Sequence, residues 1–322
     1  MGGVGLFYVW VVFAATHAQL PDPDHPILFY SNQMRQDIKL TFLQALKRAT
    51  HSLFLSVYGI TDPEVLDVLC KKADDHLVVR VEYDPTASAP LKKTLPSAIQ
   101  TRAVTSSGLM HRKVIVIDHT QLFLGSANLT PTSLIHHANL VLGLHHPSLA
   151  AFLESPTSTY YCFEVQGQQG ELYLFPDPLK CGLTRLLEKI DEAKRSILIA
   201  MFTLTHMQIG EALVQAKKRG VDITIAIDAY TARGASKKLI HTLEQEGIRF
   251  ILSQGKELLH HKWALIDEEI LILGSANWTK AAFNKNHDFL LFLFSLKKTQ
   301  TDFLKRLWEV IEAESIDLKA VS

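Results

Sequence analysis

The sequence contains an internal repeat, and this repeat limits the folds that the chain can adopt more than any other feature. Residues 42–84 align without a gap with residues 186–228. Phe42, Leu46 and Ala49 form an apolar stripe at helical spacing, and apolar residues occupy all three equivalent positions in the second copy. Self-similarity on this scale indicates a duplicated structural unit.

Each copy predicts the same order of elements: helix, strand, helix, strand, then a strand hairpin and a closing strand and helix. The buried strands are "LFLSVY" and "ILIAMF", and the second strands, "LVVRVEYD" and "VDITIAID", end in the matching residues Asp84 and Asp228. Alternating strands and helices predict the α/β class. We expect two repeated α-β-α layered domains, each a mixed sheet with helices on both faces, related by a pseudo-twofold axis.

The repeat sets the expected domain boundaries. The first repeat is predicted over residues 19–158 and the second over 159–322, with the polar, turn-rich residues 154–171 as a linker. Residues 1–18 resemble a secretory signal, because an apolar run is followed by small residues and then by Pro and Asp. The expected location is therefore exported, secreted or periplasmic. Residues 3–16 as an uncleaved membrane anchor are the alternative.

Composition excludes little. The chain of 322 residues has 33 basic and 33 acidic residues, so no overall positive field marks a nucleic-acid-binding protein. Its three cysteines fit neither a zinc site nor a dense disulfide scaffold. Cys162 and Cys181 could pair if the protein is exported, whereas Cys70 falls opposite Val214 and reads as a core residue.

One motif, H-x-K-x4-D-x6-G-S-x-N, occurs once in each repeat, in "HRKVIVIDHTQLFLGSAN" (residues 111–128) and "HHKWALIDEEILILGSAN" (residues 260–277). Six fixed residues match at a given position with a probability on the order of 10⁻⁸, so two matches at corresponding places are not accidental. The shared positions are His111, Lys113, Asp118, Gly125, Ser126 and Asn128 in the first copy and His260, Lys262, Asp267, Gly274, Ser275 and Asn277 in the second.

The spacing has a geometric reason. Residues two apart on a strand point to the same face, so the histidine and lysine of each copy project together. A hairpin then returns the serine and asparagine beside them. Across a twofold axis the two copies would surround one point with two imidazoles, two ammonium groups and two carboxamides, a set that suits a phosphodiester.

The pattern resembles the HKD motif of the phospholipase D superfamily, and the resemblance covers the chain after residue 26. It implies a phosphohistidine intermediate formed without metal or cofactor, and a phospholipase D-type phosphodiesterase. One imidazole attacks phosphorus and the other protonates the leaving alkoxide. Lys113, Lys262, Asn128 and Asn277 are expected to balance charge on the non-bridging oxygens.

The histidine roles are predicted from the residues that follow each motif. Asn139 stands at the same offset after His111 as Asp288 does after His260, and the superfamily usually has an acidic residue there. A carboxylate raises the pKa of its imidazole, whereas a carboxamide only orients the ring. If each histidine pairs within its own repeat, His111 is the nucleophile and His260 the general acid.

Other residues have two readings. Asp118 and Asp267 are catalytic candidates within the motif, but both begin a hairpin turn and also read as structural supports. The pairs His136–His137 and His145–His146 could hold metal only with partners that the sequence does not supply at ligand spacing, so loop histidines and no metal site are expected.

The substrate is predicted less sharply than the reaction. A membrane phospholipid fits the two motifs in one chain, the signal-like start and the apolar residues near each histidine, with water or an alcohol as acceptor. The alternative is an exported, non-specific endonuclease acting on DNA or RNA, for which a basic stripe would be expected. A minor alternative is an inactive binding scaffold. Because one chain carries both half-sites, a monomer is expected.

Overall fold

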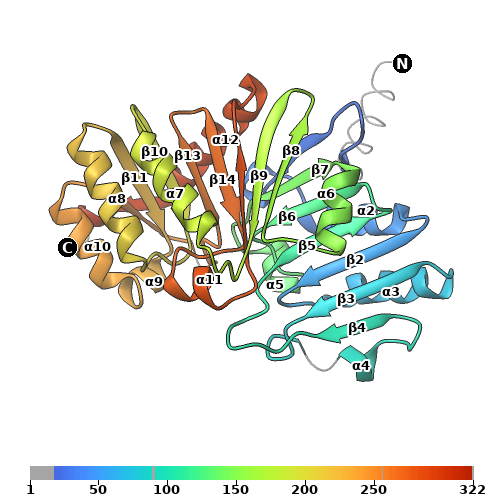
Figure 1. The fold of residues 1–322 in the computed structure, drawn as a ribbon. Helices are drawn as coiled ribbons and strands as arrows, with labels where there is room; N and C mark the ends of the chain where they lie inside the picture. The colour runs from blue at the N-terminus through green and yellow to red at the C-terminus, as the bar shows by residue number, and fades with distance from the viewer. Residues whose placement is uncertain (1–17, 89–90, 256, 321–322) are drawn as a thin grey trace, which may run out of the picture.

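The structure is a computed structural model that describes residues 18–88, 91–255 and 257–320. Within these residues the chain forms two β-sheets that lie beside one another, one from each repeat (Figure 1). The first half ends with a helix at Glu154, and the first strand of the second half begins at Tyr160. The boundary predicted after residue 158 falls in this short connection.

The first sheet combines a parallel β2–β3–β4 region with antiparallel neighbours. From edge to edge it contains β1 (Ile27–Tyr30), β7 (Val141–His145), β6 (Gln121–Gly125), β5 (Lys113–Ile117), β2 (Ser52–Val57), β3 (Val78–Tyr83) and β4 (Gln100–Ala103). Its helices are η1 (Asn32–Met34), α2 (Ile38–Arg48), α3 (Pro63–Asp74), α4 (Leu91–Thr94), α5 (Pro131–Ile135) and α6 (Pro147–Glu154).

The second sheet repeats this plan and adds strands at both edges. Its order is β16 (Ser315–Asp317), β12 (Arg249–Ser253), β11 (Asp222–Ile227), β10 (Ser196–Met201), β13 (Lys262–Ile266), β14 (Ile270–Gly274), β15 (Phe289–Leu293), β9 (Gln168–Leu174) and β8 (Tyr160–Val165). Its helices are α7 (Cys181–Glu192), α8 (Met207–Lys218), α9 (Ala229–Arg233), α10 (Lys237–Gln245), α11 (Lys280–Asn284), α12 (Lys298–Ala313) and η2 (Leu318–Ala320).

Three apolar layers hold the two sheets together. Helices α2 and α3 cover the outer face of the first sheet, and α7, α8 and α10 cover the outer face of the second. Between the sheets, their inner faces share one core with α6 and α12. Each sheet is therefore covered on both faces, and the predicted α/β class with two layered repeats is confirmed.

The same strand pairing recurs in both halves. Val57 at the end of β2 lies opposite Lys113 at the start of β5, and Met201 at the end of β10 lies opposite Lys262 at the start of β13. Equivalent motif residues therefore leave the two sheets at equivalent edges. Isolated bridges between the halves, Met110 with His287 and Ala138 with Leu259, then bring the two edges together.

The predicted linker over residues 154–171 is wrong, because most of it forms the hairpin of β8 and β9 at the edge of the second sheet. The turn is at Gln166 and Gly167, both with positive φ. On β8 the buried Phe163 and Val165 alternate with exposed polar residues. An edge hairpin with one wet face has the composition of a linker, which explains the error.

Cys162 and Cys181 are exposed and unpaired, so the structure contains no bridge between them. Of the predicted signal over residues 1–18, residues 1–17 lie outside the described residues, and so does the whole of the alternative anchor over residues 3–16. Among the helices that the structure does describe, none is both long and apolar enough to cross a bilayer.

Candidate active site

Backbone pairing across the two halves fixes the loops that carry the motif histidines. The amide of His111 donates to the carbonyl of His287 (2.9 Å), and the amide of His260 donates to the carbonyl of Ala138 (2.9 Å). Each loop is thus hydrogen-bonded to the half of the chain that does not contain it. His111 also lowers the pKa of His260, so the two histidines lie near one another at the boundary between the halves.

The side-chain partners of the histidines are exchanged between the halves. Asp288 Oδ1 lies 2.8 Å from His111 Nδ1, and Asn139 Oδ1 lies 3.1 Å from His260 Nδ1. The pairing expected from the sequence, with each histidine held by its own repeat, is therefore wrong. The pseudo-twofold axis places each partner beside the histidine of the other half.

His111 is held as a neutral imidazole against a carboxylate. Burial and then Lys113 lower the pKa of His111, while Asp288 acts in the opposite direction. Burial alone would raise the pKa of Asp288, but His111, Lys113 and Ser275 lower it to about 2. An ionised carboxylate only accepts, so His111 Nδ1 carries the proton and Nε2 keeps its lone pair.

His260 has the same tautomer without a negative partner. The carboxamide nitrogen of Asn139 donates to the carbonyl of Ser133 at 2.9 Å, which turns its oxygen toward His260. Burial, then Lys262 and Lys113, lower the pKa of His260 well below its ordinary value. The two imidazoles therefore differ in the charge behind them although their geometry is alike.

The two motif lysines are buried close to both imidazoles. Lys113 Nζ donates to the carbonyl of His111 at 2.6 Å, and Lys262 Nζ donates to that of His260 at 2.9 Å. Burial lowers the pKa of Lys113 to about 7, and burial with the charge of Lys113 lowers the pKa of Lys262 well below its ordinary value. A bound anion would relieve this crowding of positive charge.

Two aromatic rings that the sequence reading left unassigned support the lysines and histidines. The ammonium of Lys113 lies 5.0 Å from the ring centre of Tyr58, and that of Lys262 lies 5.3 Å from the ring centre of Phe202. The same rings contact the two imidazoles. Tyr58 and Phe202 follow aligned strands in the two repeats, and an aromatic residue at both equivalent positions could have marked them as part of the site.

The motif serines act on the histidine partners. Ser126 donates to Asn139 Oδ1 at 2.8 Å, and Ser275 donates to Asp288 Oδ1 at 2.6 Å. All four side chains are buried. The serines therefore orient the groups that orient the imidazoles.

Asn128 and Asn277 are the motif residues left with unused hydrogen-bonding capacity. Each side chain has a buried Oδ1 atom without a hydrogen-bond partner in the described structure. Buried polar atoms are rarely left unpaired. The same orphan atom at both equivalent positions marks a place where a ligand or water completes the site.

Asp84 and Asp228, which close the second strand of each repeat, position the histidine loops. Asp84 Oδ2 accepts from the amide of Met110 at 2.9 Å, and Asp228 Oδ2 accepts from the amide of Leu259 at 3.0 Å. Each of these amides belongs to the residue directly before a motif histidine. The sequence alignment found both aspartates but gave them no role.

Asp118 and Asp267 lie outside this cluster, at the far ends of β5 and β13. Asp118 accepts from the backbone amides of Thr50, His51 and Ser52, and Asp267 accepts from three amides at the equivalent turn. Five strand residues separate each aspartate from the lysine end, about 16 Å along the strand. The geometry supports their structural reading over the catalytic one.

Replacing Asp118 with alanine is expected to lower the free energy of unfolding by about 1–3 kcal/mol at pH 7, because three amides lose a charged acceptor. Burial acts to raise the pKa of Asp118, but the hydrogen bonds from these amides outweigh burial and lower that pKa. The stabilisation is present above the ordinary carboxyl pKa and is lost as pH falls through the folded-state value. Denaturant unfolding at pH 7 and pH 3 measures both effects.

The matched control is Asp75→Ala, which removes an exposed carboxylate at the end of α3. It should leave unfolding nearly unchanged. The turnover number is then measured per folded molecule of Asp118→Ala. If it falls as far as in a histidine variant, Asp118 has a catalytic role.

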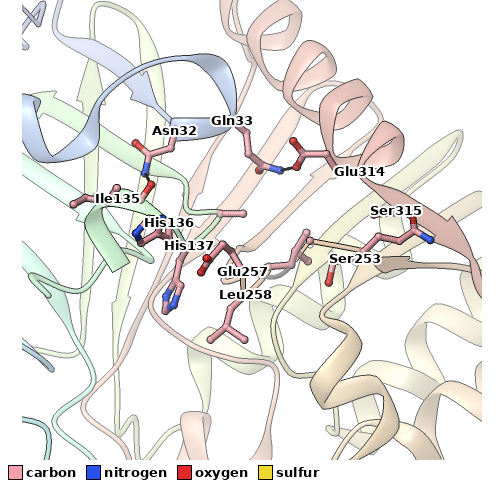
Figure 2. A pocket seen from close by; sticks show the side chains of 14 residues that line it. Asn32, Gln33, Ile135, His136, His137, Ser253, Glu257, Leu258, Glu314 and Ser315 are labelled. Atoms are coloured by element: carbon pink, nitrogen blue, oxygen red, sulfur yellow. Dashed lines mark hydrogen bonds between the residues drawn. The ribbon is translucent and has the colours of Figure 1, made fainter. Parts of the chain in front are cut away.

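A cavity of about 530 Å³ opens beside His260, between the two halves. Figure 2 shows His137 from the first half beside Glu257 and Leu258 from the second. The ring centre of His137 lies 5.7 Å from that of His260, which links the cavity to the reacting groups. Its volume suits a small polar group and its neighbouring atoms.

The paired histidines do not form a metal centre in the described part of the chain. No group of three or more His, Cys, Asp or Glu side chains there has the arrangement to hold a metal ion. His136 is exposed at the cavity, and His146 caps α6 by accepting from the amide of Leu149 at 3.0 Å.

Comparison with protein families gives a match over both repeats. The family described as "Cardiolipin synthase, PLD-like domain" matches residues 42–156 and 186–310. Together these two segments cover most of the chain and include both motifs.

Individual relatives are similar over part of their length. Mitochondrial cardiolipin hydrolase of Mus musculus is 31% identical over 131 residues, which cover 40% of this chain and 58% of that protein. Cardiolipin synthase of Halalkalibacterium halodurans is 25% identical over 333 residues, which cover 86% of this chain and 66% of that protein. The chain thus spans less than two thirds of either relative.

The fold is that of a solved protein at low identity. The crystal structure of phosphatidylserine synthase from Haemophilus influenzae superposes with a TM-score of 0.71 and 13% identity, covering 94% of this chain and 89% of that one. The likeness extends through both layered repeats.

Proposed function

Because the chain belongs to the phospholipase D superfamily, we propose that it is a phosphodiesterase that acts on membrane phospholipid through a phosphohistidine intermediate. The observation that carries this proposal is the exchange of partners between halves. Because of this exchange, the imidazoles of His111 and His260 are buried, neutral and in the same tautomer, close to both motif lysines. This arrangement serves two successive displacements at one phosphorus atom.

In the first displacement, His111 Nε2 attacks phosphorus and the bond to the alkoxide leaving group breaks. The ring of His111 gains positive charge as the N–P bond forms, and Asp288 offsets that charge. This favours His111 as nucleophile, for a reason different from the one read in the sequence. His260 protonates the departing oxygen as its imidazolium, a form that the negative charge of the bound phosphodiester stabilises.

In the second displacement, water or an alcohol attacks the same phosphorus. Neutral His260 takes the proton of the incoming oxygen, the N–P bond breaks and His111 is regenerated. Water gives hydrolysis and an alcohol gives phosphatidyl transfer. The cavity beside His260 lies where the leaving or incoming alcohol would be held.

Lys113, Lys262, Asn128 and Asn277 are proposed to bind the non-bridging oxygens. The two ammonium groups meet the charge that grows on these oxygens in the transition state. The Nδ2 amides of the asparagines would donate to these oxygens, while their unpartnered Oδ1 atoms, which only accept, would take a hydrogen bond from water or a substrate hydroxyl. Ser126 and Ser275 act indirectly, through Asn139 and Asp288.

A phospholipid substrate is supported by the relatives named as cardiolipin hydrolase and cardiolipin synthase. The cavity adds a local argument, since the carboxylates of Glu257 and Glu314 line it. They would repel the further phosphates of a nucleic-acid strand. We therefore keep endonuclease activity as the alternative result of the experiment below.

The test gives the purified chain phospholipid vesicles and single-stranded DNA in parallel, in EDTA, with His111→Ala as the blank. Head-group release is expected, unaffected by EDTA and absent from the blank. Adding glycerol should divert part of the product to a phosphatidyl alcohol. Strand cleavage without head-group release would replace the proposal with a nuclease.

A further inference from the structure

Large apolar side chains are exposed mainly around the active site. Five of the seven that are exposed in the described structure lie in loops or at helix ends, beside the sheet edges that carry the histidines. These five are Leu109, Ile135, Leu179, Met207 and Tyr230. Leu179 is 81% exposed and Tyr230 is 78% exposed.

Strand register places these five residues on one side of the molecule. Leu174, Met201 and Ile227 end β9, β10 and β11 at the edge where Lys262 begins β13. Leu179, Met207 and Tyr230 follow those strand ends directly in the chain. We call these five residues the apolar rim. Val78, by contrast, begins β3 at the opposite edge.

Unpaired cations stand between the rim residues. Lys180, Lys280, Lys285 and Arg233 are exposed, and none forms an ion pair with a described residue. Burial and then Lys280 and Lys180 lower the pKa of His206, which places both ammonium groups near the start of α8. Gly108, next to Leu109, packs against the backbone of Lys285.

We propose that the apolar rim and its four cations dock the protein on the surface of an anionic phospholipid bilayer, with the active site facing the lipid head groups. This inference rests on the proposed function and names the surface from which the substrate is taken. Separate apolar tips enter the outer bilayer, and the cations meet lipid phosphates. Tyr230 has the amphipathic ring that favours the interface.

A bilayer explains the rim better than a protein partner does. The apolar side chains are separate tips with cations between them, whereas a protein interface has a continuous apolar centre with few lysines. Nucleic acid would use the cations but would gain little from Leu179 or Met207. Apolar tips and cations together fit an anionic bilayer, which has a charged surface and an apolar interior.

The experiment measures binding of the full chain to vesicles of neutral phosphatidylcholine, with and without an anionic phospholipid, by flotation. The test variant is Leu179→Asp with Tyr230→Asp, and the control is Val78→Asp, which adds a charge at an exposed position on the opposite edge. Binding by the parent should rise with the anionic fraction. The test variant should bind at least about tenfold more weakly, because two apolar anchors are lost.

Turnover of a monomeric short-chain phospholipid separates docking from catalysis. The test variant should turn over this soluble substrate like the parent while losing most turnover on vesicles. Equal vesicle binding by the test variant, the parent and the Val78→Asp control would overturn the docking proposal. DNA binding that needs the cations but not the apolar tips would overturn it as well.

The two proposals fail in different ways. If the parent has no activity on the soluble phospholipid, the proposed function fails, while the flotation result still decides whether the rim binds lipid. Thermal unfolding of both variants checks that each is folded, which their exposed positions lead us to expect.

Discussion

His111→Ala is expected to lower the turnover number by roughly 10⁴-fold or more, because the atom that forms the covalent bond is removed. His260→Ala is expected to lower it by roughly 10²–10⁴-fold with a natural alkoxide leaving group. The second loss should nearly vanish in the first displacement from a p-nitrophenyl ester, whose leaving group needs no proton. Stopped-flow release of p-nitrophenol measures this difference.

Intact mass after a denaturing quench at alkaline pH identifies the nucleophile, because the N–P bond of phosphohistidine is labile in acid. With the p-nitrophenyl ester, His260→Ala should accumulate the phosphohistidine, since the base for the second displacement is missing. His111→Ala should show no added mass. Added mass in His111→Ala alone would exchange the two roles.

Asp288→Asn is expected to lower the turnover number by roughly 10²–10⁴-fold, because an amide neither offsets charge on His111 nor accepts as strongly from its Nδ1–H. The pH profile gives a second reading. Asp288 raises the pKa of His111 against the effects of burial and Lys113. Its loss should move the acidic limb of kcat/KM, where neutral His111 appears, to lower pH.

Asn139→Asp is the matched control, since it places a carboxylate behind the other imidazole. The pKa of His260 should rise, so the alkaline limb of the profile should move to higher pH. If Asp288→Asn and Asn139→Asp changed the same limb in the same direction, the asymmetric roles of the histidines would be wrong.

The repeat and the motif made the fold predictable. Aligned apolar stripes such as Phe42–Leu46–Ala49 indicate which side of a helix is buried, and the buried side is the one that packs on the sheet. The hairpin of β8 and β9 was missed because its exposed side chains read as a linker. A wet strand face and a loop have the same composition.

The pairing of side chains was not predictable from one-dimensional alignment. Asn139 and Asp288 were found through their offset from His111 and His260, and that offset measures distance along the chain. The contact that matters crosses the boundary between the halves, which only the packing of the two sheets determines. Asp118 kept two readings for a related reason, since the motif spans a whole strand and both of its ends.

The crossed partners have a consequence for how such a chain can change over time. In a dimer of two identical subunits, every substitution appears on both sides of the axis, so both imidazoles would keep the same kind of partner. Joining two copies in one chain removes that constraint. Asp288 can then remain a carboxylate while Asn139 is an amide, and a symmetrical site can assign its two histidines different work.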